Sequence, residues 1–264
     1  MRRLLGLALA AVVALGIGAL GAGTALAKDW KKLRIATEGA YPPFNEVGPD
    51  GKLKGFDIDI ANALCAELKV ECEITTHDWD GMIPALIARK FDAIVASMSI
   101  TEERKKKVDF TDKYYQTPAR YVAKKGSSIE ISAQGLKGKR IGVQRETIHD
   151  RYATDNYGNV AQIVRYGTQD EANLDLSAGR VDLLLADSIA LKTGFLDTAA
   201  GKDFAFVGPE LRDPKWFGEG AGIAVRKEDD DLKRMLNQAI AAIRKNGTYD
   251  RIAGKYFDFD VYGS

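Results

Sequence analysis

Short apolar runs alternate along the chain with segments in which apolar residues recur at helical spacing. The run "LRIAT" at 33–37 precedes a segment from Asp57 with helical spacing, and "CEIT" at 72–75 follows it. Parallel strands joined by helical crossovers produce this alternation, so the pattern predicts an α/β fold. A later helix is predicted by the spacing of Leu232, Met235, Leu236, Ala239, Ile240 and Ile243, with Asn246-Gly247 as its stop signal.

Two internal similarities indicate that the chain contains two lobes of similar construction. "RIATE" at 34–38 resembles "RIGVQ" at 140–144, and "RKFDAIVAS" at 89–97 resembles "GRVDLLLAD" at 179–187. Each pair ends on polar residues: Glu38 with Gln144, and Ser97 with Asp187. Ligands of open α/β sheets bind beyond the carboxyl ends of the strands, so we expect two half-sites that face one ligand. Coincidence between short strings is the alternative.

Two extended segments, at 117–125 and 220–227, are the predicted crossings between the lobes, because each follows turn-forming residues. We therefore expect a first lobe formed by 28–117 and 220–264, and a second lobe at 118–219.

The first 27 residues have the pattern of an export signal. Arg2 and Arg3 precede an apolar run, and Ala25-Leu26-Ala27 forms a small-x-small cleavage site. An uncleaved membrane anchor is the alternative, because 4–27 carries no charge. Lys28 rather than a cysteine follows Ala27, which argues against lipid attachment. We expect a protein that is free in the periplasm.

Composition narrows the partners and the chemistry. Cleavage would remove 27 of 264 residues, leaving 237, and would reduce 38 basic residues by two, to 36, against 37 acidic ones. This balance argues against nucleic acid or an anionic membrane as the main partner. Cys65 and Cys72 are the two cysteines, and an oxidising compartment favours a disulfide between a helix end and the next strand. Two buried thiols remain an alternative, while metal ligation lacks a histidine at ligand spacing.

Two predicted helix starts could hold a carboxylate. "SMSITEERKKKVDFT" at 97–111 places Thr101 as an N-cap and Arg104 beside it, and a guanidinium pairs both oxygens of a carboxylate. "GVQRETIHD" at 142–150 places Thr147 as a second N-cap, with Asp150 as a weaker capping-box partner. Solvated surface charge is the alternative for Arg104, and capping alone would explain Thr147.

The aromatic residues Tyr41 and Trp79 could form flat walls that sandwich an elongated or cationic group, although a place in the core would also explain them. His77 and His149 are the only histidines, and neither belongs to a nucleophile pattern. The sequence has no phosphate loop or metal-ligand cluster, so we expect no cofactor and no metal.

Taken in order, these motifs resemble the polar amino-acid binding proteins of ABC importers, in particular the lysine-arginine-ornithine and histidine binding branch. The resemblance covers essentially the whole mature chain, through "AYPPF", "GFDIDIANALC", "WDGMIPAL", "FDAIVASMSITEERKKKVDFT", "LKGKRIGVQ", "FVGPE" and "NGTYDRIAGKYFDFDVYG". It implies the two-lobe type II periplasmic binding protein fold, with mixed sheets flanked by helices and a hinge of two crossings. It also implies delivery of one amino acid to a membrane permease, by a receptor that we expect to be a monomer.

The resemblance also implies roles for individual residues. Arg104 would bind the ligand α-carboxylate, helped by Ser99 and the backbone at Thr147. Asp187 and Ser97 would bind the α-ammonium. Glu38 would face a distal cation, and the remaining expected lining residues are Tyr41, Trp79, Ala96, Gln144 and His149. The spacing of Cys65 and Cys72 matches the disulfide of this branch.

Three positions depart from the family pattern. Ala96 stands where relatives often have Ser, Glu146 replaces a common Gly, and His149 replaces a residue that is often polar and uncharged.

The resulting functional hypothesis is a receptor for a basic amino acid, with arginine first, then ornithine and lysine, then histidine. An arginine-derived opine or a neutral polar amino acid is the alternative ligand. A periplasmic dehydratase on the same scaffold, with Glu38 or Asp187 as general acid, is the competing enzyme hypothesis, and a sensor module is disfavoured.

Overall fold

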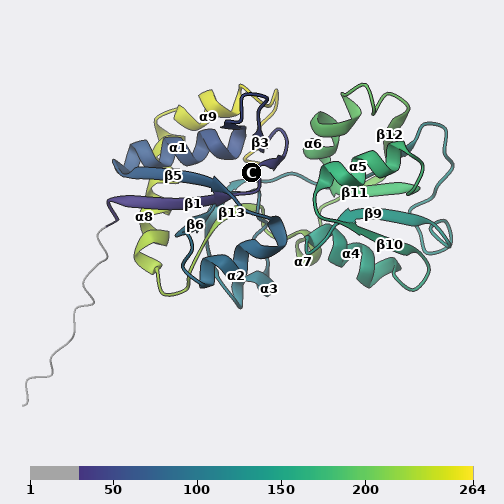
Figure 1. Ribbon diagram of the computed structural model, residues 1–264, viewed down its shortest axis with the longest axis horizontal. Coiled ribbons are helices and arrows are strands. Elements are labelled where there is room, and N and C mark those ends of the chain that lie inside the picture. The colour runs from purple at the N-terminus through teal and green to yellow at the C-terminus, as the bar shows by residue number, and fades with distance from the viewer. Residues whose placement is uncertain (1–29, 264) are drawn as a thin grey trace, which may run out of the picture.

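The computed structural model describes residues 30–263 and shows two lobes side by side, each a five-stranded mixed sheet with helices on both faces (Figure 1). The predicted two-lobe α/β fold is confirmed. The expected export signal at 1–27 lies outside the described residues.

Lobe 1 contains the N-terminal strands and the C-terminal helices. Its sheet has the order β5-β1-β6-β13-β7, and a small antiparallel sheet joins β2, β3 and β4. In chain order its elements are β1 (Lys32–Thr37), β2 (Ala40–Tyr41), β3 (Asn45–Val47), β4 (Leu53–Lys54), α1 (Phe56–Leu68), β5 (Glu71–Thr76), η1 (Trp79–Gly81), α2 (Met82–Ile87), β6 (Ala93–Ile94), α3 (Glu102–Lys105), β7 (Asp109–Tyr115), β13 (Ala221–Val225), α8 (Asp230–Lys245) and α9 (Thr248–Ala253).

Lobe 2 is built from the middle of the chain, and its sheet has the order β10-β9-β11-β8-β12. The short helix α7 (Pro214–Phe217) lies between the lobes in Figure 1. The other elements are β8 (Ala119–Lys124), β9 (Arg140–Gln144), α4 (Ile148–Tyr157), β10 (Gln162–Tyr166), α5 (Gln169–Ser177), β11 (Leu183–Asp187), α6 (Ser188–Leu191), η2 (Lys192–Leu196) and β12 (Phe204–Leu211).

The two sheets repeat one arrangement, which explains the internal similarities of the sequence. In each sheet three parallel strands are followed by one antiparallel strand, β13 in lobe 1 and β8 in lobe 2. The similar strands β1 and β9 take the same place in the two sheets, as do β6 and β11.

The chain passes between the sheets after β7 and again after β12. Most of the two extended segments at 117–125 and 220–227 is therefore strand, β8 and β13, rather than connecting chain. The lobe boundaries themselves stay a prediction.

Alternation of side chains along the strands divides the core of lobe 1 between the two faces of its sheet. Leu33 and Ile35 of β1 join a buried cluster with α1, α8 and α9, whereas Ala36 joins the cluster on the α2 face. The helix predicted at 232–243 is α8, whose buried residues are Leu232, Leu236, Ala239, Ile240 and Ile243. Residues two apart on a strand thus bury against the same layer of helices.

Cys65 of α1 and Cys72 of β5 form a disulfide, so the predicted link between a helix end and the next strand is confirmed. Among the described residues, no helix has both the length and the apolar character that a membrane span requires.

Candidate functional site: a cleft between the lobes

The strand ends that were expected to face a ligand converge between the lobes. Glu38 follows β1, Gln144 ends β9 and Asp187 ends β11. Two adjoining pockets share Tyr41, Ser97, Ser99, Ile148 and His149. The Glu38 pocket adds Glu38, Trp79, Ala96, Arg104, Gln144 and Thr147, and the Asp187 pocket adds Asp187 with Tyr115, Gln116, Thr117, Ala119, Arg212, Phe217, Gly218, Gly220 and Ala221. All eleven residues expected to line a ligand site therefore lie in one continuous cleft.

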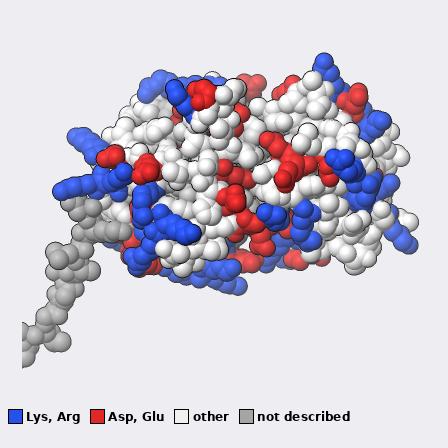
Figure 2. Space-filling view, viewed as in Figure 1, with Lys and Arg blue, Asp and Glu red and all other residues white. Residues whose placement is uncertain are grey.

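Glu38 contacts its counterpart from the other lobe. The amide Nε2 of Gln144 donates to Glu38 Oε1 at 2.5 Å and to the carbonyl of Gly167 at 3.0 Å. Burial raises the pKa of Glu38 to about 7, and the hydrogen bond from Gln144 opposes this rise. The negative charges of Asp170, Asp78 and Asp80 raise the pKa further, so a cation beside Glu38 would favour its ionised form. Figure 2 shows acidic side chains gathered along the junction of the lobes on the viewed face.

Arg104 provides the opposite charge in the same pocket. Thr101 caps α3 by accepting a hydrogen bond from the Arg104 backbone N–H at 3.3 Å, as predicted. The guanidinium donates to the carbonyls of Ser99 at 3.0 Å and, across the lobes, of Glu146 at 3.5 Å. Burial lowers the pKa of Arg104 to about 10, which leaves it charged at neutral pH. The negative charge of Glu146 opposes this lowering of the pKa, but within residues 30–263 no carboxylate forms an ion pair with Arg104, so the guanidinium is open to an anionic ligand group.

The start of α4 forms the side of the pocket contributed by lobe 2. Thr147 Oγ1 accepts from the backbone N–H of Asp150 at 3.1 Å, as predicted. The Asp150 carboxylate accepts from the N–H of Glu146 at 3.2 Å, so this capping interaction reaches one residue beyond the N-cap that we expected. Glu146, one of the three departures from the expected pattern, has a φ of 58°, a left-handed conformation that favours Gly.

His149 contributes a neutral ring to both pockets. Burial lowers its pKa to about 3, and the charge of Arg104 acts in the same direction. At neutral pH the imidazole can therefore donate or accept a hydrogen bond without adding charge to the site.

Asp187 lies at the start of α6 and shares its pocket with Ser97 and Tyr41. Its Oδ1 accepts from the backbone N–H groups of Ile189 at 2.8 Å and Ala190 at 3.1 Å, and its Oδ2 accepts from Thr117. Burial raises the pKa of Asp187 to about 6, so the group is largely ionised at neutral pH.

Trp79 has a neighbour that the sequence did not indicate. The Arg104 guanidinium carbon lies 5.2 Å from the centroid of the Trp79 ring, within the range of a cation–π contact. One aromatic wall of the Glu38 pocket thus supports a side chain of the protein itself.

The chain matches a family model over residues 33–259, that of the bacterial extracellular solute-binding proteins, family 3. It belongs to this family. The L-arginine-binding protein of Pseudomonas aeruginosa is 56% identical over 235 residues, which cover 89% of this chain and 91% of that protein. The lysine/arginine/ornithine-binding periplasmic protein of Escherichia coli is 41% identical and covers 94% of this chain and 95% of its own length.

A solved structure of an ancestral arginine-binding protein bound to glutamine is also similar to the chain. It superimposes with a TM-score of 0.79 at 37% identity and covers 87% of this chain and 99% of the other. Family 3 membership and these relatives confirm that the chain is a solute-binding protein rather than an enzyme, so the dehydratase hypothesis is set aside.

Several lining residues were missed by the sequence reasoning, among them Gln116, Thr117 and Arg212. They lie in or beside the two passages between the sheets, which we had interpreted only as connections. The turn formers around Thr117-Pro118 gave a signal for a crossing, and the crossing also places side chains in the cleft. Ile148, directly after the predicted N-cap Thr147, could have been inferred from that position.

Proposed function

We propose that this family 3 protein is a periplasmic receptor for a basic L-amino acid, with arginine preferred, then ornithine and lysine, then histidine. The observation that carries this proposal is one pocket with two opposite buried charges, Arg104 and Glu38. An α-carboxylate matches the guanidinium, and a side-chain cation matches the acid.

The α-ammonium group would be held in the adjoining pocket by Asp187 and Ser97. Ser99 and the N-terminal backbone of α4 at Thr147 would supplement Arg104 at the carboxylate. Because β1, β6 and α3 belong to lobe 1 while β11 and α4 belong to lobe 2, a bound amino acid would contact both lobes and stabilise their closed arrangement.

The pKa of Glu38 adds a condition to ligand selection. Ionised Glu38 facing a neutral side chain would be a buried charge without a cation, which costs several kcal/mol. With a pKa of about 7, however, Glu38 can take up a proton and then tolerate a neutral ligand. Selection for arginine over glutamine should therefore be stronger above pH 7 than below it, and the related ancestral protein was solved with glutamine bound.

The named relatives support arginine as the first choice, and membership of the extracellular solute-binding proteins supports delivery to an ABC importer permease as the role. The first-named relative is an arginine-binding protein, and the second binds lysine, arginine and ornithine in the periplasm. The export signal expected at 1–27 is consistent with the same compartment.

Titration calorimetry with arginine, ornithine, lysine, histidine, glutamine and an arginine-derived opine tests the proposal. Arginine should bind most tightly at pH 8, and Glu38→Gln should weaken arginine at least about 30-fold while changing glutamine little. Glutamine binding as tightly as arginine at pH 8 would overturn the basic-ligand proposal. Mass spectrometry of ligand that copurifies with the protein provides an independent identification.

A further inference from the structure

Asp57, in the first turn of α1, is a fully buried carboxylate next to the cleft that lines neither pocket. It accepts three hydrogen bonds: from the hydroxyl of Tyr114 at 2.7 Å, from Nδ2 of Asn45 at 2.8 Å and from Oγ of Ser97 at 2.9 Å. The partners come from β7, from β3 and from the segment after β6, so the carboxylate joins three parts of lobe 1.

The Asp57 carboxylate determines the direction of the Ser97 hydroxyl. An ionised carboxylate can only accept, so the Ser97 proton points away from the pocket and its lone pairs remain for a ligand. The Tyr114 hydroxyl, which donates to Asp57, accepts in turn from the backbone N–H of Ser97 at 3.1 Å. Ser97 has a φ of 55°, a left-handed conformation that a serine keeps only where its surroundings hold it.

The same carboxylate is connected to the turn that carries Glu38. Asn45, whose amide nitrogen donates to Asp57, accepts through Oδ1 from the backbone N–H of Gly39 at 2.7 Å. Gly39 directly follows Glu38, so one buried group is linked to both the Ser97 and the Glu38 sides of the cleft.

We propose that Asp57 is a positioning residue: by accepting the hydrogen bond of the Ser97 hydroxyl, it leaves the Ser97 oxygen as an acceptor for the ligand α-ammonium. The inference rests on the proposed function and deepens it. A ligand must then bring a hydrogen-bond donor to the Ser97 oxygen. The cleft should therefore prefer an amino acid to the same compound without its α-ammonium group.

A double-mutant cycle with two ligands tests this role. The variants are Asp57→Asn, Ser97→Ala and the combination, and the ligands are arginine and its analogue with hydrogen in place of the α-ammonium. Asp57→Asn should weaken arginine about tenfold or more and the analogue less than about threefold, because only arginine uses the oriented hydroxyl. In the Ser97→Ala background the same change should cost arginine less than about threefold.

Asp92→Asn is the matched control, because Asp92 is also a buried carboxylate of lobe 1 and lines neither pocket. It should lower stability without changing the ratio of the two affinities. Equal losses of arginine and analogue in Asp57→Asn, or full additivity with Ser97→Ala, would overturn the proposal.

Tyr114→Phe replaces Asp57→Asn if the latter does not fold. It removes the hydroxyl that holds both Asp57 and the Ser97 backbone N–H, and should thereby loosen the alignment of the Ser97 hydroxyl with the carboxylate. A loss confined to arginine supports the role, and an equal loss of both ligands rejects it. Should the unchanged protein bind a different amino acid, the proposed basic specificity fails, and the cycle is run with that amino acid and its deaminated analogue.

Discussion

The two lobes carry the same arginine–aspartate clamp at corresponding places, but only in lobe 1 is the aspartate of the clamp buried. In lobe 1, Arg34 donates to Asp92 through its backbone N–H, Nε and Nη2, at 2.9–3.2 Å. In lobe 2, Arg140 donates to Asp182 through the same three groups, at 2.8–3.2 Å. Each guanidinium also reaches a backbone carbonyl, of Arg89 in lobe 1 and of Gly179 in lobe 2.

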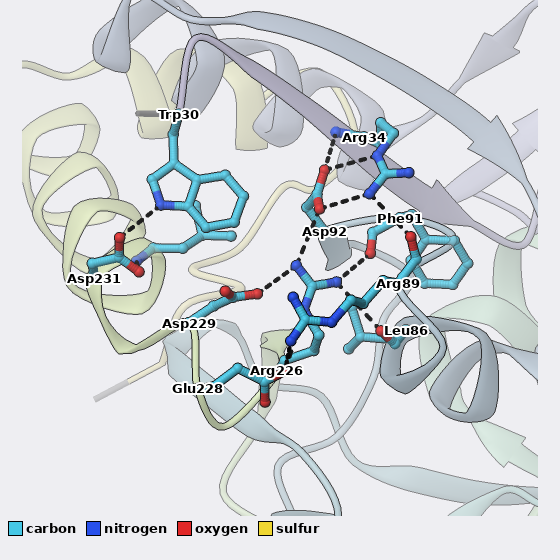
Figure 3. Close-up of polar contacts among 11 residues, drawn as sticks. Trp30, Arg34, Leu86, Arg89, Phe91, Asp92, Arg226, Glu228, Asp229 and Asp231 are labelled. Carbon is cyan, nitrogen blue, oxygen red and sulfur yellow. Dashed lines mark hydrogen bonds and ion pairs between the residues drawn. The ribbon is translucent and has the colours of Figure 1, made fainter. Parts of the chain in front are cut away.

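A second arginine distinguishes lobe 1. Arg226, 2% exposed, donates to Asp92 at 3.1 Å and to the carbonyl of Phe91 at 2.6 Å, and it also pairs with Asp229 (Figure 3). The strand registers place Lys124 at the corresponding position of lobe 2, and that lysine is exposed. Its compact ammonium group offers no planar fork that could serve several acceptors at once.

The same sequence pattern therefore contributes differently to the free energy of unfolding in the two lobes. The side chains of Arg140 and Asp182 are only partly buried, so water and salt limit the contribution of their ion pair. In lobe 1 the buried ion pair is that of Arg226 with Asp92. It contributes little when intact, relative to apolar packing, yet removing one member leaves the other as a buried charge with a partner missing.

The largest effect is expected for Arg226→Met. It leaves Asp92 with Arg34 alone and should lower the free energy of unfolding by about 3–5 kcal/mol in urea titrations. Lys124→Met, the matched change in lobe 2, should alter it by less than about 0.5 kcal/mol. Similar losses from the two variants would contradict the distinction between the lobes.

A smaller difference is expected between the aspartates themselves. Asp92→Asn should cost about 2–4 kcal/mol of unfolding free energy, since it deprives the buried Arg226 of one of its two aspartate partners, and Asp182→Asn about 0–1 kcal/mol. The pKa of each aspartate is lowered in the folded state, so both contributions are complete above pH 4 and are lost in more acidic solution. Urea titrations at pH 7 and pH 3 measure the difference, which should narrow at pH 3.

Glu38 and Gln144 lie at corresponding strand ends of the two lobes and meet in the cleft. A ligand cation lowers the raised pKa of Glu38, so arginine binding releases a proton and the affinity falls as the pH drops through about 7, approaching tenfold per pH unit. Calorimetry from pH 5.5 to 8 measures this slope. Burial also raises the pKa of Asp187, so both carboxylates can contribute to the pH dependence of the affinity. The contribution of Glu38 is the part of the slope that Glu38→Gln removes. An unchanged slope in that variant would show that Glu38 is not the group that titrates.

The smallest effect is expected at the rim of the cleft, where exposed ion pairs join the lobes. Arg145 pairs with Asp80 at 2.5 Å, and Arg151 pairs with Glu103. Arg145→Met should weaken arginine binding by about two- to fivefold at low salt and by less at 0.5 M salt. A loss that does not depend on salt would indicate an effect other than this ion pair.

The sequence was most informative where local patterns repeat. The similar strings that end at Glu38 and Gln144 led to equivalent strands, and the Thr101 and Thr147 caps followed from local backbone chemistry. It was least informative where a side chain finds a partner far along the chain. Arg226 stands beside a run of charges that reads as solvated surface, and only the packing of β13 beside β6 brings it to Asp92, 134 residues away.

The same limit applies inside the cleft. Nothing local indicates that Gln144 donates to Glu38, because the two residues are 106 positions apart and belong to different lobes. Asp57 lies in the first turn of an amphipathic helix, where an acid commonly faces water. Its burial depends on Tyr114 and Asn45, which reach it from two other strands.

The late position of β13 in the chain has a consequence for the order of assembly. All five strands of the lobe 2 sheet lie within 119–211, whereas the lobe 1 sheet needs β13 at 221–225. If the chain emerges into the compartment where it folds with its N-terminus first, the middle of the polypeptide can therefore complete its sheet while the part that emerged first still lacks a strand. Asp92 can pair with Arg34 as soon as both have emerged, but its second arginine, Arg226, follows it by 134 residues.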